Sequence, residues 1–148
     1  MRIAPLAIIA VTAATVFMTG TSAIIAQPRG AASAAPLRAL SERDMRAAHG
    51  SGCQLSFDAG RSTLVYVIEH EFMIRTGAGR TVCRISDAQF SRLSGGGTQI
   101  CGGYRITVRE TGRSVGHQES DSASAPATLT VAGRGRPWTV RGHWGSAC

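Results

Sequence analysis

The sequence lacks the short motifs that mark most catalytic and cofactor sites. It has neither the G-x-S-x-G elbow of a serine hydrolase nor a phosphate-binding loop ending in Lys-Ser/Thr, so the glycines at 95–97 and 102–103 are predicted to form turns. It has no C-x-x-C pair and no histidine at ligand spacing from two cysteines, which argues against structural zinc. We therefore expect no catalytic residue, no cofactor and no metal.

Lysine is also absent, because all 16 basic residues are arginines; these outnumber the nine acidic residues. Such a composition, rich in arginine, alanine and glycine, is typical of a GC-rich genome. The excess of positive charge predicts attraction to an anionic surface component or to a protein of the cell envelope. No basic stripe is studded with aromatic residues, which disfavours nucleic acid. Most arginines are expected to lie scattered on solvent-facing sides of strands.

No charged residue lies between Arg2 and Arg29. A short basic start, an apolar stretch over 3–18 and small residues before position 27 predict a secretory signal peptide at 1–26. An uncleaved membrane anchor is the alternative, because the uncharged stretch exceeds the roughly 18 residues of a spanning helix. Repeated threonines and the lack of an aromatic flank favour cleavage. Both alternatives place the rest of the chain outside the cytoplasm, as a periplasmic or secreted protein that contacts membrane only if the leader stays uncleaved.

All four cysteines, Cys53, Cys83, Cys101 and Cys148, lie beyond this leader. Four cysteines in a small exported domain predict two disulfides, with three possible connectivities. We favour Cys53–Cys148, which ties the first strand to the last, and Cys83–Cys101, which spans a short helix. Disulfides would help to stabilise the modest core of about a hundred residues.

Apolar residues alternate with polar ones from Cys53 onward, which is typical of half-buried strands. We predict an all-β domain over 51–148, mainly antiparallel, folded as a small barrel or sandwich with one or two short helices. About seven strands are expected, the second bent or bulged near 69–71: 53–58, 63–75, 80–85, 104–109, 115–120, 128–132 and 138–144.

The loop at 76–79 predicts a hairpin in which Arg75 pairs with Arg80 and Phe72 faces Cys83, since apolar parity and turn length then agree.

Two short helices are expected. Residues 27–50 are predicted to be a flexible arm with a helix over Pro36–Ala48, Pro36 being its first residue; Ser41 and Asp44 form a capping box that offers an alternative start. A second capping box, Ser86-Asp87-Ala88-Gln89, predicts a helix from Asp87 to Leu93.

Titratable residues offer little catalytic chemistry. In Glu69-His70-Glu71, strand alternation would point the histidine away from both carboxylates, so a bend with solvated acids is expected. His117 and Glu119 share parity near several serines, but no nucleophile motif accompanies them, and His143 receives no role. The tryptophans at 138 and 144 are expected in the core rather than in a sugar-binding patch.

Two polar loops are candidate binding segments. One is the Ser/Ala/Pro loop 121–127 with its flank, and the other is the Gly/Arg-rich loop 132–136. Their candidate binding residues are Ser120, Asp121, Ser122, Ser124, Arg134 and Arg136. These loops predict a non-catalytic binding or envelope-associated module; a small periplasmic hydrolase is one alternative.

A second alternative comes from a resemblance. Cys101-Gly102-Gly103, the alternating stretch 104–108, Ser122-Ala123-Ser124-Ala125, a tryptophan-bearing strand and the near-terminal cysteine resemble periplasmic inhibitors of c-type lysozyme. The resemblance covers the last third of the chain. It implies a small disulfide-linked β-barrel that occludes a lysozyme active site.

Overall fold

The computed structural model describes residues 35–133 and 135–148, and of residues 117 and 118 only the backbone. The predicted signal peptide, the first part of the predicted arm and Arg134 lie outside the described residues. No helix in the described residues is long and apolar enough to cross a membrane.

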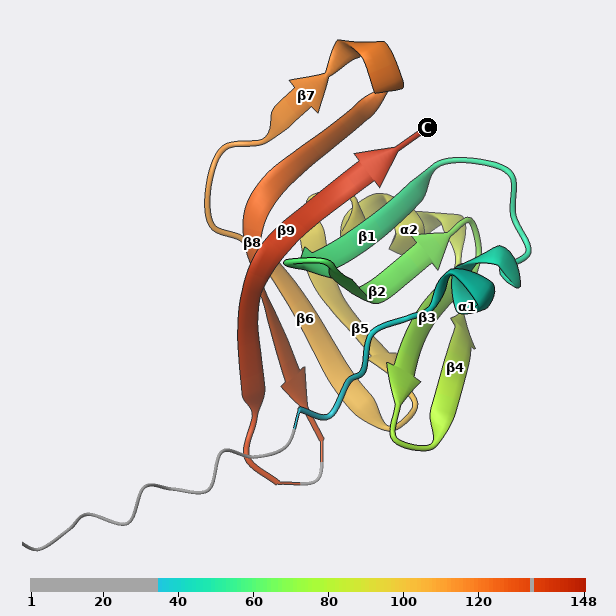
Figure 1. The fold of residues 1–148 in the computed structure, drawn as a ribbon, viewed down its shortest axis with the longest axis vertical. Helices are drawn as coiled ribbons and strands as arrows, with labels where there is room; N and C mark the ends of the chain where they lie inside the picture. Colours follow the sequence, from blue (N-terminus) through green and yellow to red (C-terminus); the bar gives the residue numbers. More distant parts are fainter. Residues whose placement is uncertain (1–34, 134) are drawn as a thin grey trace, which may run out of the picture. The chain divides into compact units, whose positions relative to one another are not determined.

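In the described part of the chain, nine antiparallel strands form one sheet that curls into a nearly closed barrel, accompanied by two short α-helices (Figure 1). The strand order is β4-β3-β2-β1-β9-β8-β6-β5, and β7 pairs with β8. The all-β, antiparallel prediction is therefore confirmed, with a barrel-like sheet rather than a sandwich. The elements are α1 Glu42–Arg46, β1 Gln54–Ala59, β2 Ser62–Ile68, β3 Glu71–Thr76, β4 Gly79–Arg84, α2 Asp87–Leu93, β5 Gly96–Cys101, β6 Tyr104–Glu110, β7 Val115–His117, the 3-10 helix η1 Gln118–Ser120, β8 Ser122–Ala132 and β9 Trp138–Ala147.

The predicted register of the β3–β4 hairpin and the predicted start of α2 are confirmed. In the β3–β4 hairpin, Arg75 pairs with Arg80 and Phe72 with Cys83, because turn length and apolar parity demand the same register. Helix α2 begins after Ser86, whose side chain accepts from Gln89 N while the Gln89 side chain accepts from Ser86 N.

The expected long strand over 63–75 is instead two strands, β2 and β3. A tight turn at Glu69 and His70 reverses the chain, and Glu69 adopts a φ of 46°. The sequence pattern did not predict this turn because β3 is covered on both faces and is therefore apolar without alternation. Phe72, Met73 and Ile74 are all buried. Unbroken apolar sequence is what such strands require.

Two other segments differ from the prediction. Residues 96–101, whose first two glycines were predicted to lie in a turn, form β5. Residues 122–127, expected as a loop, belong to the 11-residue strand β8, which pairs with β9 throughout. Small side chains weaken strand propensity, but here neighbouring strands on both sides supply the pairing. Pro126 is tolerated because its carbonyl accepts from Thr111 N, just past the end of β6, so its missing N–H also faces away from β9 and breaks no hydrogen bond of the β8–β9 ladder.

The barrel interior is filled by the inward positions of all the long strands. Trp144 is 1 % exposed, and its Nε1 donates to the carbonyl of Leu93 at 2.9 Å, which fixes the end of α2 against the barrel. Gly142 lies two residues before Trp144, where Phe57 and the backbone of Asp58 occupy the space that a side chain would need. The missing side chain of Gly142 thus lets β1 approach β9 closely.

Two disulfides join Cys53 to Cys148 and Cys83 to Cys101, the two pairs favoured by the sequence. The second crosses the seam where β4 meets β5, the two ends of the strand order. It closes the barrel where the described strands share no hydrogen-bonded ladder.

Segment 35–50 packs against the sheet instead of extending from it as an arm. Leu37 is 3 % exposed within the core cluster and Leu40 is 6 % exposed. Arg38 N and Leu40 N donate to the carbonyls of Arg75 and Thr63, which joins this segment to the ends of β3 and β2. Helix α1 begins after Ser41, so the predicted start at Pro36 is wrong. Pro36 precedes an extended stretch in which Arg38 pairs with Arg75.

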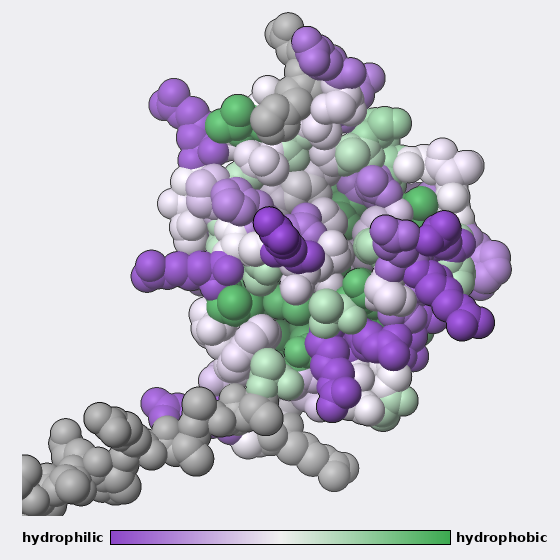
Figure 2. All heavy atoms as spheres, in the orientation of Figure 1, coloured by the Kyte–Doolittle hydropathy of each residue, from purple (hydrophilic) through white to green (hydrophobic). Residues whose placement is uncertain are grey.

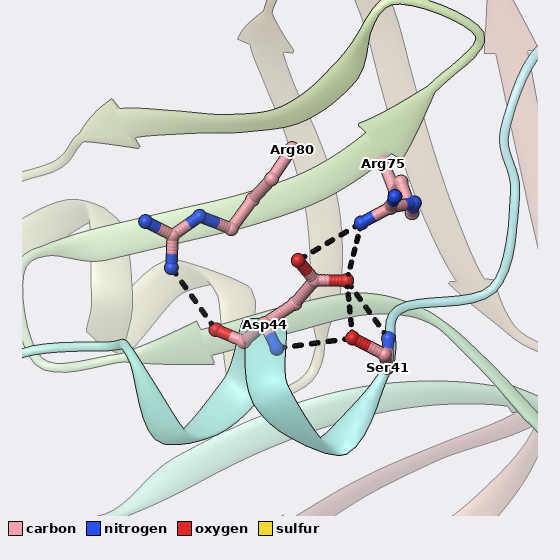
Figure 3. Close-up of polar contacts among 4 residues, drawn as sticks. All are labelled: Ser41, Asp44, Arg75 and Arg80. Atoms are coloured by element: carbon pink, nitrogen blue, oxygen red, sulfur yellow. Dashed lines mark hydrogen bonds and ion pairs between the residues drawn. The ribbon is translucent and has the colours of Figure 1, made fainter.

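Asp44 fastens α1 to the sheet (Figure 3). Its carboxylate accepts from Ser41 N at 2.9 Å, from Ser41 Oγ at 2.8 Å, and from Arg75 Nη1 at 2.9 and 2.7 Å, while Arg80 Nη1 donates to its backbone carbonyl. The backbone hydrogen bond from Ser41, followed by the contacts with the Ser41 hydroxyl and Arg75, holds the pKa of Asp44 below its usual value.

Candidate binding surface

The cluster Glu69-His70-Glu71 is structural. Glu71 is 6 % exposed and accepts from His49 N at 3.1 Å, while Glu69 accepts from Ser51 N at 2.9 Å. The prediction of solvated carboxylates is therefore wrong, because both acids tie down the segment that leads into β1. His70 points elsewhere, with Nδ1 3.4 Å from Asp87 Oδ1 on the surface.

The remaining titratable candidates do not converge. Glu119 lies in η1 rather than in a strand with residue 117, whose side chain is outside the described part of the structure. His143 is exposed on the outer side of β9. Trp144 is in the core and Trp138 is half-buried against it, so the two tryptophans form no surface patch.

The predicted loop residues are dispersed. Ser122 and Ser124 are half-buried in β8, where they line a polar hollow of about 210 Å³ with Ser56, Asp58 and others of β1 and β9. Ser120 ends η1 and Asp121 forms the turn into β8. Arg136 is exposed in the β8–β9 connection, and Arg134 lies outside the described residues. No single loop therefore gathers these residues into one site.

A different surface gathers charge: the outer side of β5, β6, β8 and β9, here called the basic face. Alternation puts Arg105 and Arg109 of β6 and Arg141 of β9 on this side, and all three are exposed. Their inward neighbours, such as Ile106 and Val108, are buried. Arg109 and Arg141 lie opposite the same residue of β8, Thr128, from either side. The two arginines are thus two strands apart, roughly 10 Å between backbones.

The basic face is also free of compensating charge. Among its described outward positions no residue is acidic, and its three guanidinium groups form no ion pair with any described residue. On the other half of the barrel, Arg75 pairs with Asp44 and Arg46 with Glu42, while Arg61 and Arg84 are exposed and form no ion pair with a described residue. Figure 2 shows hydrophilic side chains crowded over α1 and its neighbouring strands, whereas those near β8 and β9 project singly between paler surfaces. Uncompensated cations on one face create a local positive potential.

Between the arginines runs a row of hydroxyl groups. Registers place Thr98, Thr107, Thr130 and Thr139 side by side on β5, β6, β8 and β9, a set we call the threonine row. Their Oγ1 atoms pair at 2.9 Å between the first two and at 3.1 Å between the last two. The row presents hydroxyl donors and acceptors along the basic face.

A hollow of about 300 Å³ adjoins the row at one end. It is lined by Ile100, Gly103, Arg105, Ala132 and Gly133. Gly133 belongs to the loop predicted as a binding segment. Ile100 is 63 % exposed, so the hollow combines one apolar wall with one cation.

Sequence reasoning treated these arginines as scattered. Strand parity in 104–109 and 138–144 correctly places Arg105, Arg109 and Arg141 outward. What was missing was the strand order, since β6 and β9 become near neighbours only because β8 lies between them.

Burial also changes the pKa of a tyrosine. Desolvation raises the pKa of Tyr66, whose hydroxyl donates to Gln54 Oε1 on the outer side of β1 and β2.

In the described residues, no three histidine, cysteine or acidic side chains gather in a way that could hold a metal ion. Comparison with protein-family models, with curated proteins and with solved structures finds no match for this chain.

Proposed function

We propose that this protein is an exported, non-catalytic binding module that attaches to an anionic component of the cell envelope through its basic face. The observation that carries the proposal is a set of three exposed arginines on the outer side of β6 and β9 that form no ion pair with a described residue, on a face whose described outward positions hold no acidic residue. Charges arranged in this way favour association with polyanions and speed encounter.

Export is supported by two features. The uncharged leader between Arg2 and Arg29 fits a signal peptide. The two disulfides are typical of an oxidising compartment. A periplasmic or secreted location follows, where anionic envelope components are the abundant partners.

The alternatives have weaker support. The resemblance to lysozyme inhibitors rests partly on a serine-containing loop, but Ser122 and Ser124 are paired within β8. A hydrolase would need convergent titratable groups, while His70 and Glu119 lie in separate elements and each acid of the 69–71 cluster already binds a backbone N–H.

The proposal is tested by sedimenting the full-length, oxidised protein with isolated cell envelopes over a range of salt concentrations. The variant R105Q/R109Q/R141Q removes the basic face. R61Q/R84Q/R92Q is its matched control, since these arginines are also exposed, equal in charge, and located elsewhere. We expect the first variant to lose at least about tenfold in affinity and most of the salt dependence, and the control to lose far less. Equal losses in both would mean that net charge alone binds, which contradicts the proposal.

A further inference from the structure

The basic face carries more than charge, and its composition indicates a class of ligand. Resting on the proposed function, we infer that this ligand is an acidic polysaccharide. Arg105, Arg109 and Arg141 hold its anionic groups, and the threonine row with the adjoining hollow contacts its sugar rings.

The threonine row is suited to a polyhydroxylated chain. Four strands at about 4.8 Å spacing give a row of roughly 14 Å, long enough for several ring hydroxyls rather than a single ion. Within each pair, Thr98–Thr107 and Thr130–Thr139, one hydroxyl hydrogen is used between the partners. The pair keeps one donor and free lone pairs, which matches the mixed donor and acceptor character of sugar hydroxyls.

The arginines are placed to bracket such a chain. Arg109 and Arg141 flank Thr128 in the register row beside the threonine row, and Arg105 lies in the row on its other side. A chain that follows the threonine row therefore has cations on both sides. Guanidinium groups bind carboxylate and phosphate through paired, planar hydrogen bonds.

The hollow adds the apolar contact that a sugar ring needs. Ile100 and Arg105 are register neighbours at its wall, one residue row from Thr98 and Thr107. A ring lying there would place its C–H face on Ile100 and an acidic substituent near Arg105. The hollow is shallow and open to solvent, which suits one ring of a longer chain better than an enclosed small molecule.

The same face is poorly suited to other polyanions. Of its described outward side chains, only Ile100 is both large and apolar, and none is a phenylalanine, tyrosine or tryptophan. Membrane surfaces are normally entered by aromatic or bulky apolar residues beside the cations. Single-stranded nucleic acid is normally stacked on aromatic rings. Hydroxyl groups between unpaired arginines favour a glycan.

The test compares pairs of polymers that carry the same anionic group, where one polymer of each pair contains sugar rings and the other does not. Polygalacturonate and poly-L-glutamate both carry carboxylates; phosphomannan and polyphosphate both carry phosphates. The full-length, oxidised protein is titrated with each by calorimetry. We expect at least one sugar polymer to bind more tightly than its sugar-free counterpart.

The decisive variant is T98V/T107V/T130V/T139V, which removes every hydroxyl of the threonine row and keeps shape, charge and strand propensity. We expect it to weaken the sugar polymer about threefold to tenfold, a change that one or two hydrogen bonds account for, and to leave the sugar-free polymer unchanged. R109Q/R141Q should weaken both polymers.

Opposite results separate the two proposals. The glycan inference is overturned, while the charged face stands, if T98V/T107V/T130V/T139V is folded by circular dichroism and binds both polymers like the parent protein. The same conclusion follows if phosphatidylglycerol vesicles or duplex DNA bind more tightly than either sugar polymer. If R109Q/R141Q leaves every affinity unchanged, the basic face is not the site and both proposals fall.

Discussion

Replacing Gly142 by alanine should destabilise the barrel strongly, because no space exists for one methyl group. A Cβ at this position would overlap the carbonyl oxygen of Asp58 and lie 2.9 Å from Phe57 Cζ. Phe57 is fully buried, and the oxygen belongs to the backbone of β1, which pairs with β9. Neither group can rotate away, so β1 and β9 must separate locally.

The size of the effect follows from two opposing terms. Overpacking a dense core costs about 1–3 kcal/mol, and backbone strain against a carbonyl places this site at the upper end. Loss of glycine's freedom in the unfolded chain returns about 0.4–1 kcal/mol. A net loss of about 2 kcal/mol lowers the melting temperature of a domain this size by roughly 8–16 °C.

The assay is thermal and urea unfolding with both disulfides intact, monitored by tryptophan fluorescence. Gly116→Ala is the matched control, since Gly116 also lies in a strand but a Cβ there meets no atom within 4 Å. It should be neutral or slightly stabilising. If Gly142→Ala melts within a degree or two of Gly116→Ala, the close approach of β9 to β1 is not a property of the protein and the packing argument fails.

Three further predictions concern contacts that stabilise the fold: the Asp44 cap, the two disulfides and the hydrogen bond of Trp144. Asp44→Asn should lower the free energy of unfolding by about 1–2 kcal/mol at neutral pH, because it weakens the helix cap and the contact with the sheet. The pKa of Asp44 is lowered in the folded state, so its stabilising contribution is present above the unfolded pKa of about 3.9 and is lost as pH falls through the folded value. The urea midpoints of parent and variant should therefore converge in acid. Limited reductant should open the exposed Cys53–Cys148 bond before the bond to Cys101, which is 1 % exposed, as read by alkylation and mass spectrometry; the reverse order would contradict the burial. Trp144→Phe should cost about 1–3 kcal/mol by leaving a buried carbonyl of α2 without its donor, and a smaller loss in urea unfolding would mean that water replaces it.

What the sequence could predict was local. The register of Phe72 with Cys83 and the start of α2 at Ser86 each follow from residues close together in the chain, so pattern and turn chemistry suffice. The turn at Glu69 was missed for the opposite reason: α1 and its flanks, distant in sequence, bury the outer side of β3 and erase its alternation.

The candidate surface shows the same limit. Parity alone turns Arg109 and Arg141 outward, yet they are 32 positions apart in the chain, and only the insertion of β8 between β6 and β9 makes them flank one site. Strand β8 was itself obscured by its small residues around Pro126, whose pairing depends on neighbours rather than on intrinsic propensity.

The order in which the chain folds and oxidises matters at the seam between β4 and β5, because only a disulfide joins the two end strands of the sheet there. An open sheet ends in two strands with unsatisfied backbone groups, which are templates for pairing with other chains. The Cys83–Cys101 bond brings the two ends together, so each end shields the other. A chain that folds before oxidation would leave both ends uncovered and able to recruit further copies. We therefore expect the reduced chain to associate through these two edges more readily than the oxidised protein does.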